Sequence, residues 1–219
     1  MAKVIEVENI SQAWLEGCRL ILTYGISTRK KVKLHNFSIC IKSLQLDPRI
    51  DNFFKANMDM KVFQRTLDIV ASEKIVGDHP NYWRRLIGRE EFKTNQITRV
   101  ISRLKEQPYS TKLTLCVYSP TDFDRKYVPC ILVAELRTER EKLYMTVLIR
   151  SEDFGSKAYA DYIGLARILQ YIAEKSGLQP GGMILHIVTG FIANRDVEHI
   201  KNILTSLGKK DLNARLTKK

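Results

Sequence analysis

The chain has 219 residues, 44% of them hydrophobic, which is enough for one domain with a sizeable core. No apolar run approaches the roughly 18 residues of a membrane span, and residues 1–4 lack the apolar core of a signal peptide, so we expect a cytoplasmic protein without a membrane partner. The net charge of +12, from 36 Lys+Arg against 24 Asp+Glu, favours an anionic partner: a phosphorylated substrate, a polyanionic cofactor or a nucleic acid.

Three segments in the first half of the chain have a clear hydrophobic period. Residues 11–23 predict a helix with Ser11 as its N-cap. Residues 37–44 alternate in the manner of a strand, and residues 95–106 again carry apolar side chains at helical spacing.

The second half supplies most of a sheet. We expect strands at 112–118, 130–137 and 142–150, a helix at 160–175, a strand at 183–189 and a final helix at 196–207. The short turn at 138–141 makes an antiparallel hairpin of the second and third strands. This order predicts an α+β fold in one domain over residues 1–219, with a basic tail from about residue 208.

The informative stretch for chemistry begins at Pro129-Cys130, which opens a predicted strand. Arg150-Ser151 closes the partner strand and runs into a turn at Gly155, and a guanidinium beside a hydroxyl at such a place suits a phosphate. An arginine near Cys130 would also stabilise the thiolate, which is the nucleophilic form. Taken alone, Cys130 equally fits a buried structural cysteine, and Arg150 a surface ion pair.

The other cysteines give no sign of a metal site. Cys18, Cys40, Cys116 and Cys130 are widely spaced, with no Cys-x-x-Cys and no nearby histidine pair. We therefore expect no bound metal and no disulfide.

The run from Cys130 to Gly181 resembles the core of thymidylate synthases and the related cytidylate hydroxymethylases. In that family a Pro-Cys is followed, at the same interval, by Arg-Ser-x-Asp, here residues 150–153, and then by a helix and a Gly-Leu-x-x-Gly turn, here residues 177–181. Upstream, 95–97 resembles the family's Asp-Gln-Ile helix start, and 82–84 resembles its Trp-Arg. Thr28-Arg29 resembles its phosphate-binding arginine loop, in the form of the short archaeal-type enzymes.

The resemblance implies a mechanism and a set of partners. Cys130 would add to C6 of a pyrimidine nucleoside monophosphate, and C5 would then take a one-carbon unit from 5,10-methylenetetrahydrofolate or methylenetetrahydromethanopterin. Arg29, Arg150 and Ser151 would bind the 5′-phosphate, while Asp153 and Trp83 would orient base or cofactor. The family also implies a homodimer whose sheets pack back to back. Its phosphate site borrows an arginine pair from the partner subunit, and Lys112 is the one cation left at the place of that pair.

Asp161 departs from the family in a way that bears on the base. Thymidylate synthases carry at this place the asparagine that reads uracil, whereas a carboxylate can accept from the cytosine 4-amino group or share a proton with N3, as in cytidylate hydroxymethylases. Asp161 equally fits a carboxylate at a helix N-terminus. His79 replaces a family tyrosine and could relay protons, although it also fits an exposed loop histidine.

Other departures leave the activity open. The family's His-x-Tyr, which holds the sugar, falls at Phe191 and Ala193, and Glu73 is a guess for its early glutamate. Three readings follow: a one-carbon transferase, leaning to cytidylate hydroxymethylase over an archaeal-type thymidylate synthase; a member of the fold acting on a different nucleotide; and a non-catalytic nucleotide- or nucleic-acid-binding protein.

Overall fold

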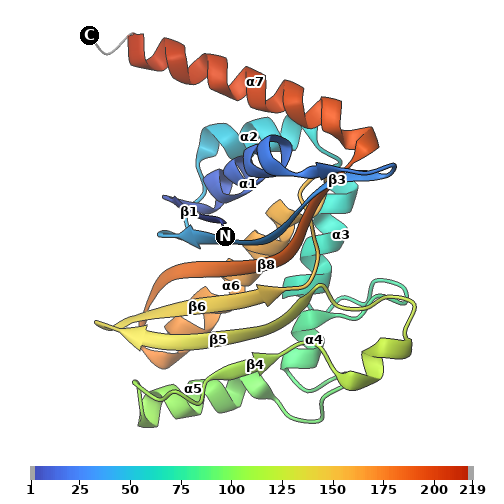
Figure 1. Cartoon of the computed structure of the whole chain (residues 1–219). Helices are drawn as coiled ribbons and strands as arrows, with labels where there is room; N and C mark the ends of the chain where they lie inside the picture. Colours follow the sequence, from blue (N-terminus) through green and yellow to red (C-terminus); the bar gives the residue numbers. More distant parts are fainter. Residues whose placement is uncertain (1–2, 217–219) are drawn as a thin grey trace.

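The computed structural model describes residues 3–216 of the chain. A mixed sheet forms its centre (Figure 1). The strand order is β1 (Lys3–Val7), β3 (Lys31–Ile41), β8 (Gln179–Ala193), β6 (Lys142–Ile149), β5 (Ile131–Glu139) and β4 (Thr114–Cys116), with β2 (Ile26–Ser27) beside β3 and β7 (Glu152–Asp153) beside β8. Parallel and antiparallel pairs both occur, so the predicted α+β fold with a mixed sheet is confirmed.

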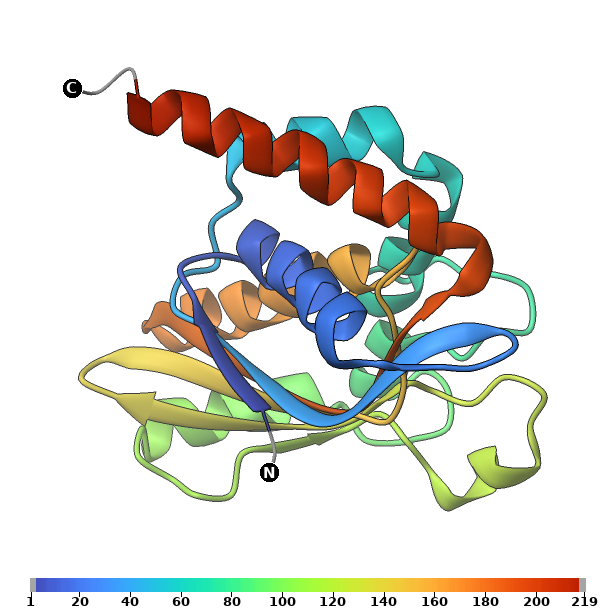
Figure 2. The ribbon, with the colours of Figure 1, turned by 45° about the horizontal axis from the view of Figure 1, so that its top comes forward.

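The helices pack against one face of this sheet. In Figure 1, α3 (Met60–Ala71) and α6 (Ala158–Ser176) lie behind the strands. Figure 2 shows α1 (Ile10–Tyr24) with α2 (Pro48–Asn57) and α7 (Asn194–Leu216) above it. The short α4 (Tyr82–Leu86) and α5 (Gln96–Glu106) complete the layer near β4. Among the described residues, no helix combines the length and apolarity needed to cross a membrane.

The predicted hairpin sets the frame of the site. β5 and β6 pair antiparallel from Ile131↔Ile149 to Glu139↔Lys142, and Arg140 and Glu141 adopt the positive φ that such a tight turn requires. β6 then connects through α6 to β8, which lies parallel to it. Because β5 begins where β6 ends, Cys130 and Arg150 meet at one end of the sheet, and the Arg150 N–H donates to the Cys130 carbonyl at 2.8 Å.

Several predicted boundaries change in the structure. Ser11 is not the N-cap of α1: Asn9 caps the helix, and the buried Ser11 hydroxyl bonds to Tyr159 instead. The final helix continues to Leu216, so the backbone from residue 208 is helical where a tail was expected; side chains beyond Leu207 and residues 217–219 lie outside the description. The pattern did not reveal β1, α2 and α3.

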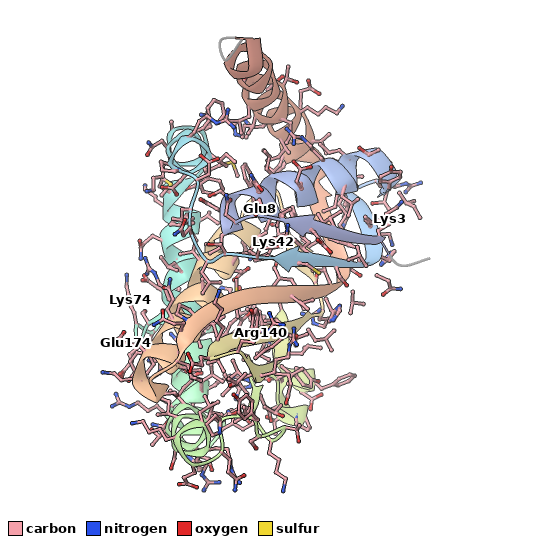
Figure 3. The ribbon with its side chains drawn as sticks, turned by 90° about the vertical axis from the view of Figure 1, so that its left-hand side faces the viewer. Lys3, Glu8, Lys42, Lys74, Arg140 and Glu174 are labelled. Atoms are coloured by element: carbon pink, nitrogen blue, oxygen red, sulfur yellow. The ribbon has the colours of Figure 1, made fainter. Side chains whose placement is uncertain are left out.

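The opposite face of the sheet carries no helix of the described chain. Figure 3 looks at the sheet from the hairpin end, where Arg140 is labelled, with α3 on one side and the open face on the other. Along β6 and β8 the buried residues point to the helices, and the alternate residues Leu148 and Val188 remain 37% and 40% exposed. The open face is therefore partly apolar.

Candidate active site

A cavity of about 330 Å³ lies at the end of the sheet where β5 begins. Its walls come from α3, from the segments preceding α4 and β5, and from the first turns of α6. Cys130, Asp161 and His79, the three residues expected to be catalytic, all line it. The volume is in the range of small-molecule sites.

Cys130 is held through its backbone at the mouth of β5. Its N–H donates to the Tyr82 hydroxyl at 3.0 Å, and its carbonyl is tied to Arg150. Burial, followed by the charges of Glu152 and Asp161, raises the pKa of the Cys130 thiol to about 11, although Arg150 and Lys157 act in the opposite direction. Arg150 thus favours the thiolate, as expected, but desolvation outweighs the cation and the net shift of the pKa is upward. At neutral pH the free side chain is a thiol.

Asp161, in the first turn of α6, forms a carboxyl pair with Glu152 of β7. Burial raises the pKa of Asp161 to about 7, even though the hydrogen bond with Glu152 and the charge of Lys157 lower it. Burial also raises the pKa of Glu152 well above its ordinary value, and the neighbouring Asp161 adds to this. No sequence motif singles out Glu152, because it occupies the variable position of Arg-Ser-x-Asp.

His79 lies in a loop, as predicted, and this loop forms part of the cavity wall. Its ring stacks on Tyr127, with the centroids 4.0 Å apart. Burial and the nearby cations, first Arg65 and Lys157, lower the pKa of His79. It is therefore a neutral imidazole at physiological pH and can both donate and accept a proton.

The cavity is also lined by three cationic side chains that no sequence motif had indicated. Arg65 comes from α3, Lys126 from the loop before β5, and Lys157 from the residue before α6. They converge only in the tertiary structure, since 92 positions separate the first from the last in the sequence. Together they give the exposed rim a positive charge above the buried carboxyl pair.

The residues expected to bind phosphate lie at three separate places in the fold. Arg150 is exposed at the end of β6, its guanidinium 3.4 Å from the Val128 carbonyl, with Ser151 next to it. Arg29 lies in the exposed turn between β2 and β3. The Asn194 N–H donates to the Lys30 carbonyl of this turn at 2.9 Å. Lys112 precedes β4 at the other end of β5, roughly 20 Å along the strand from Cys130. Within one chain it does not reach the cavity.

Of the three residues expected to orient base or cofactor, Asp161 lines the cavity, whereas Asp153 and Trp83 do not. Asp153 accepts from the Gly155 N–H at 3.0 Å and from the Ser156 hydroxyl at 2.7 Å, and so shapes the turn before α6. Trp83 packs edge-on against Tyr171, while its neighbour Tyr82 points into the cavity. Glu73 is exposed and pairs with Arg89, so it is not the missing glutamate of the cavity.

The place of the family's His-x-Tyr is apolar, as the sequence indicated. Ile192 is buried, and the Lys31 ammonium lies 4.2 Å from the centroid of the Phe191 ring. These positions carry no polar side chain.

A buried ion pair fixes the loop that carries Lys126 and Tyr127. Arg85 of α4 donates to both oxygens of Asp122, at 2.6 and 2.7 Å, and to the Val117 carbonyl at 2.8 Å. Burial alone would raise the pKa of Asp122, but the hydrogen bonds from Arg85 and from the Ser119 N–H outweigh it and hold the pKa below its ordinary value. These bonds tie the loop at this end of the cavity wall to α4.

The sequence of the chain is similar to those of a known family. The sequence model of the thymidylate synthase family matches residues 56–218. A protein named "Putative thymidylate synthase" from Methanosarcina mazei is 27% identical over 214 residues, covering 94% of this chain and 97% of its own length. A protein of the same name from Methanothermobacter thermautotrophicus is 25% identical over 224 residues, covering 93% and 99%.

Proposed function

The chain belongs to the thymidylate synthase family, in its archaeal form, and from that premise we propose that it transfers a one-carbon unit to C5 of a pyrimidine nucleoside monophosphate. The observation that carries the proposal is that Cys130 and Asp161 line one cavity beside three cations. A nucleophile and a base-reading carboxyl at one site are what this chemistry requires.

The proposed reaction begins at Cys130. Its sulfur bonds to C6 of the base, the electrons of the C5–C6 double bond move toward C4 and the ring nitrogen N3, and C5 becomes nucleophilic. Because the free side chain is a thiol, its proton must leave as the bond forms. His79, a neutral imidazole in the same wall, and the carboxyl pair are the groups placed to accept it.

Asp161 directs the proposal to cytidylate as the first substrate, with a hydroxymethyl group as the product. A carboxyl accepts from the 4-amino group of cytosine, and when protonated it also donates to N3. The 5′-phosphate would bind Arg150, Ser151 and Arg29.

A second candidate is uridylate methylation, and one property of Asp161 favours it. Burial raises its pKa to about 7, so near neutral pH much of it is a neutral acid. A neutral acid can donate to O4 of uracil and accept from its N3–H. Both bases are therefore compatible with Asp161, and the protonation state sets the balance.

The rim chemistry fits a reduced pterin with an acidic tail. Arg65, Lys126 and Lys157 would pair with carboxylate or phosphate groups, and the aromatic pair of His79 and Tyr127 offers a surface for a flat ring. When bound, methylenetetrahydrofolate or methylenetetrahydromethanopterin supplies the methylene carbon.

We also propose that the open sheet face joins two copies of the chain. The exposed Leu148 and Val188 give it apolar surface. A second copy would have to bring Lys112 to the phosphate site of the first. A sedimentation mass of one 25.3 kDa chain at micromolar concentration would overturn the dimer.

The test of the activity is tritium release from C5 of dUMP, dCMP and CMP without any one-carbon donor, since exchange at C5 needs only the cysteine adduct. We expect release with cytidylate, and a loss of at least about 10⁴-fold in Cys130→Ala, which removes the nucleophile.

Asp161→Asn is the companion variant. It should move the preference from cytidylate to uridylate by about 10- to 100-fold, because an amide serves N3–H and O4. Exchange that survives Cys130→Ala, or no exchange by the unaltered protein with any nucleotide, would overturn the proposed function.

A further inference from the structure

Glu152 lies directly behind Asp161, out of reach of solvent. It is 1% exposed, and its Oε2 has no hydrogen-bond partner among the described residues. Its carboxyl hydrogen-bonds that of Asp161, which in turn lines the cavity. Glu152 therefore lies where the free-energy cost of an ionised carboxylate is high, and its neighbour is a second carboxyl group.

Two carboxyls in contact within an apolar site cannot both ionise near neutral pH, so the pair keeps a proton. The higher affinity for that proton belongs to Glu152, whose pKa burial and Asp161 raise well above the ordinary range. Asp161 gains or loses its own proton near pH 7. The pair therefore remains a proton donor at pH values where a lone Asp161 would be fully ionised.

We propose that Glu152 is a positioning residue of the reaction, which holds a proton against Asp161 so that the pair can protonate the pyrimidine while Cys130 loses its own proton. The inference rests on the proposed function. As the C6–S bond forms, the electron pair displaced from the C5–C6 double bond reaches N3 of cytosine or O4 of uracil. Asp161 delivers a proton there, Glu152 resupplies Asp161, and the thiol proton returns to the pair. No proton is gained or lost overall.

Other ionisable groups shift the pKa values of the Glu152–Asp161 pair or of the Cys130 thiol, and so affect the pH dependence of both. They lie on α4, β7 and α6 and on the residues that flank β5, β6 and α6: Tyr82, Cys130, Arg150, Asp153, Lys157 and Tyr162. The tyrosines stay neutral because burial raises their pKa values. The test must therefore alter Glu152 alone.

The experiment compares Glu152→Gln with the unaltered protein in C5 exchange from pH 6 to pH 9. Glutamine keeps the shape and a hydrogen-bond donor to Asp161, but it has no proton to give. We expect similar rates at pH 6, where Asp161 is itself protonated. Above pH 7 the variant should fall behind by about tenfold per pH unit. Glu152→Asp, which retains an acid, should restore much of the alkaline rate.

The matched control is Asp51→Asn, a buried carboxyl away from the cavity that accepts from Tyr159 and Lys55. It should leave the pH profile unchanged. A merely structural Glu152 would lower the rate equally at every pH, which would overturn the proposal.

A second readout needs no substrate. The alkylation of Cys130 by iodoacetamide, followed by mass spectrometry of its peptide, gives the titration midpoint of the thiol. Because Glu152 raises the pKa of Cys130, Glu152→Gln should lower that midpoint by about one unit. An unmoved midpoint together with an unmoved exchange profile would overturn the role of Glu152. If the unaltered protein exchanges nothing, the proposed function fails, and the midpoint alone decides whether Glu152 acts on Cys130.

Discussion

Asp122 and Glu152 are both buried carboxyl residues, and the difference between them lies in their neighbours. Asp122 accepts two hydrogen bonds from the guanidinium of Arg85, whereas Glu152 faces the carboxyl of Asp161. The pKa of Asp122 is consequently held below its ordinary value and that of Glu152 above it. Burial raises the free-energy cost of an ionised carboxylate in both places. A cationic neighbour turns Asp122 into one half of an ion pair, whereas an acidic neighbour makes Glu152 and Asp161 a pair that holds a proton, called here the proton store.

The two carboxyl sites also have different roles at the cavity. The Arg85–Asp122 pair anchors the loop from β4 to β5, which supplies Lys126, Tyr127 and Cys130 to the wall. The Glu152–Asp161 pair lies beneath the reacting groups. The first should therefore govern stability, and the second the response to pH.

The largest effect is expected from breaking the ion pair. Asp122→Ala leaves the buried Arg85 guanidinium without its bidentate partner, because the remaining carboxylate, that of Glu90, is 3.7 Å from Nε. It should lower the free energy of unfolding by about 3 to 5 kcal/mol, measured by urea denaturation. Arg125→Ala is its control, because Arg125 is an exposed cation 3.5 Å from the same carboxylate. Its loss should cost no more than about 1 kcal/mol. Equal losses in the two variants would contradict the distinction.

A smaller change, of opposite sign, should follow from removing a carboxyl of the proton store. The folded-state pKa of Asp161 is raised to about 7, so the folded state binds an extra proton and loses stability as pH rises from about 4 to about 7. Asp161→Asn should therefore unfold like the unaltered protein at pH 4 and be about 2 to 4 kcal/mol more stable at pH 8.

Thermal and urea unfolding at both pH values measure this difference. Asp122, with its lowered pKa, contributes stability that is lost as pH falls through that pKa, so Asp122→Asn should affect the protein most at neutral pH and least in acid. A stability gain in Asp161→Asn that is the same at pH 4 and pH 8 would refute the raised pKa.

The smallest effect concerns the rim. Lys157 lowers the pKa of Asp161 and of Cys130, so Lys157→Gln should move the pH profile of C5 exchange upward, against the direction of Glu152→Gln. Because Lys157 is exposed, we expect a shift of a few tenths of a unit that shrinks in 0.5 M salt, roughly a Debye length of 4 Å. Lys126→Gln is the matched control, since Lys126 lines the same cavity without acting on Asp161.

Local pattern was sufficient for the parts of the fold that depend on neighbours in sequence. Asn95 caps the helix that begins at Gln96, Gly177 ends α6 with a positive φ, and the turn at Arg140 closes the predicted hairpin. The interval between Cys130 and Arg150 was also informative, because a hairpin of that length returns the chain to its start. Helix α3 was missed although its own period is amphipathic, and only the fold shows that its apolar face packs on α6, about a hundred residues away.

The sequence by itself therefore determined the family and the α+β class, and it was enough to predict Cys130, Asp161 and Arg150 as site residues, since each rests on residue type and spacing along one stretch. Only the tertiary structure decided that Arg65, Lys126 and Lys157 share a rim, that Tyr82 rather than Trp83 points into the cavity, and that Glu152 faces Asp161. The physical reason is that charge state depends on burial and on neighbours brought together by folding. The same carboxyl group is an anion beside Arg85 and an acid beside Asp161, and nothing in the residue type distinguishes the two.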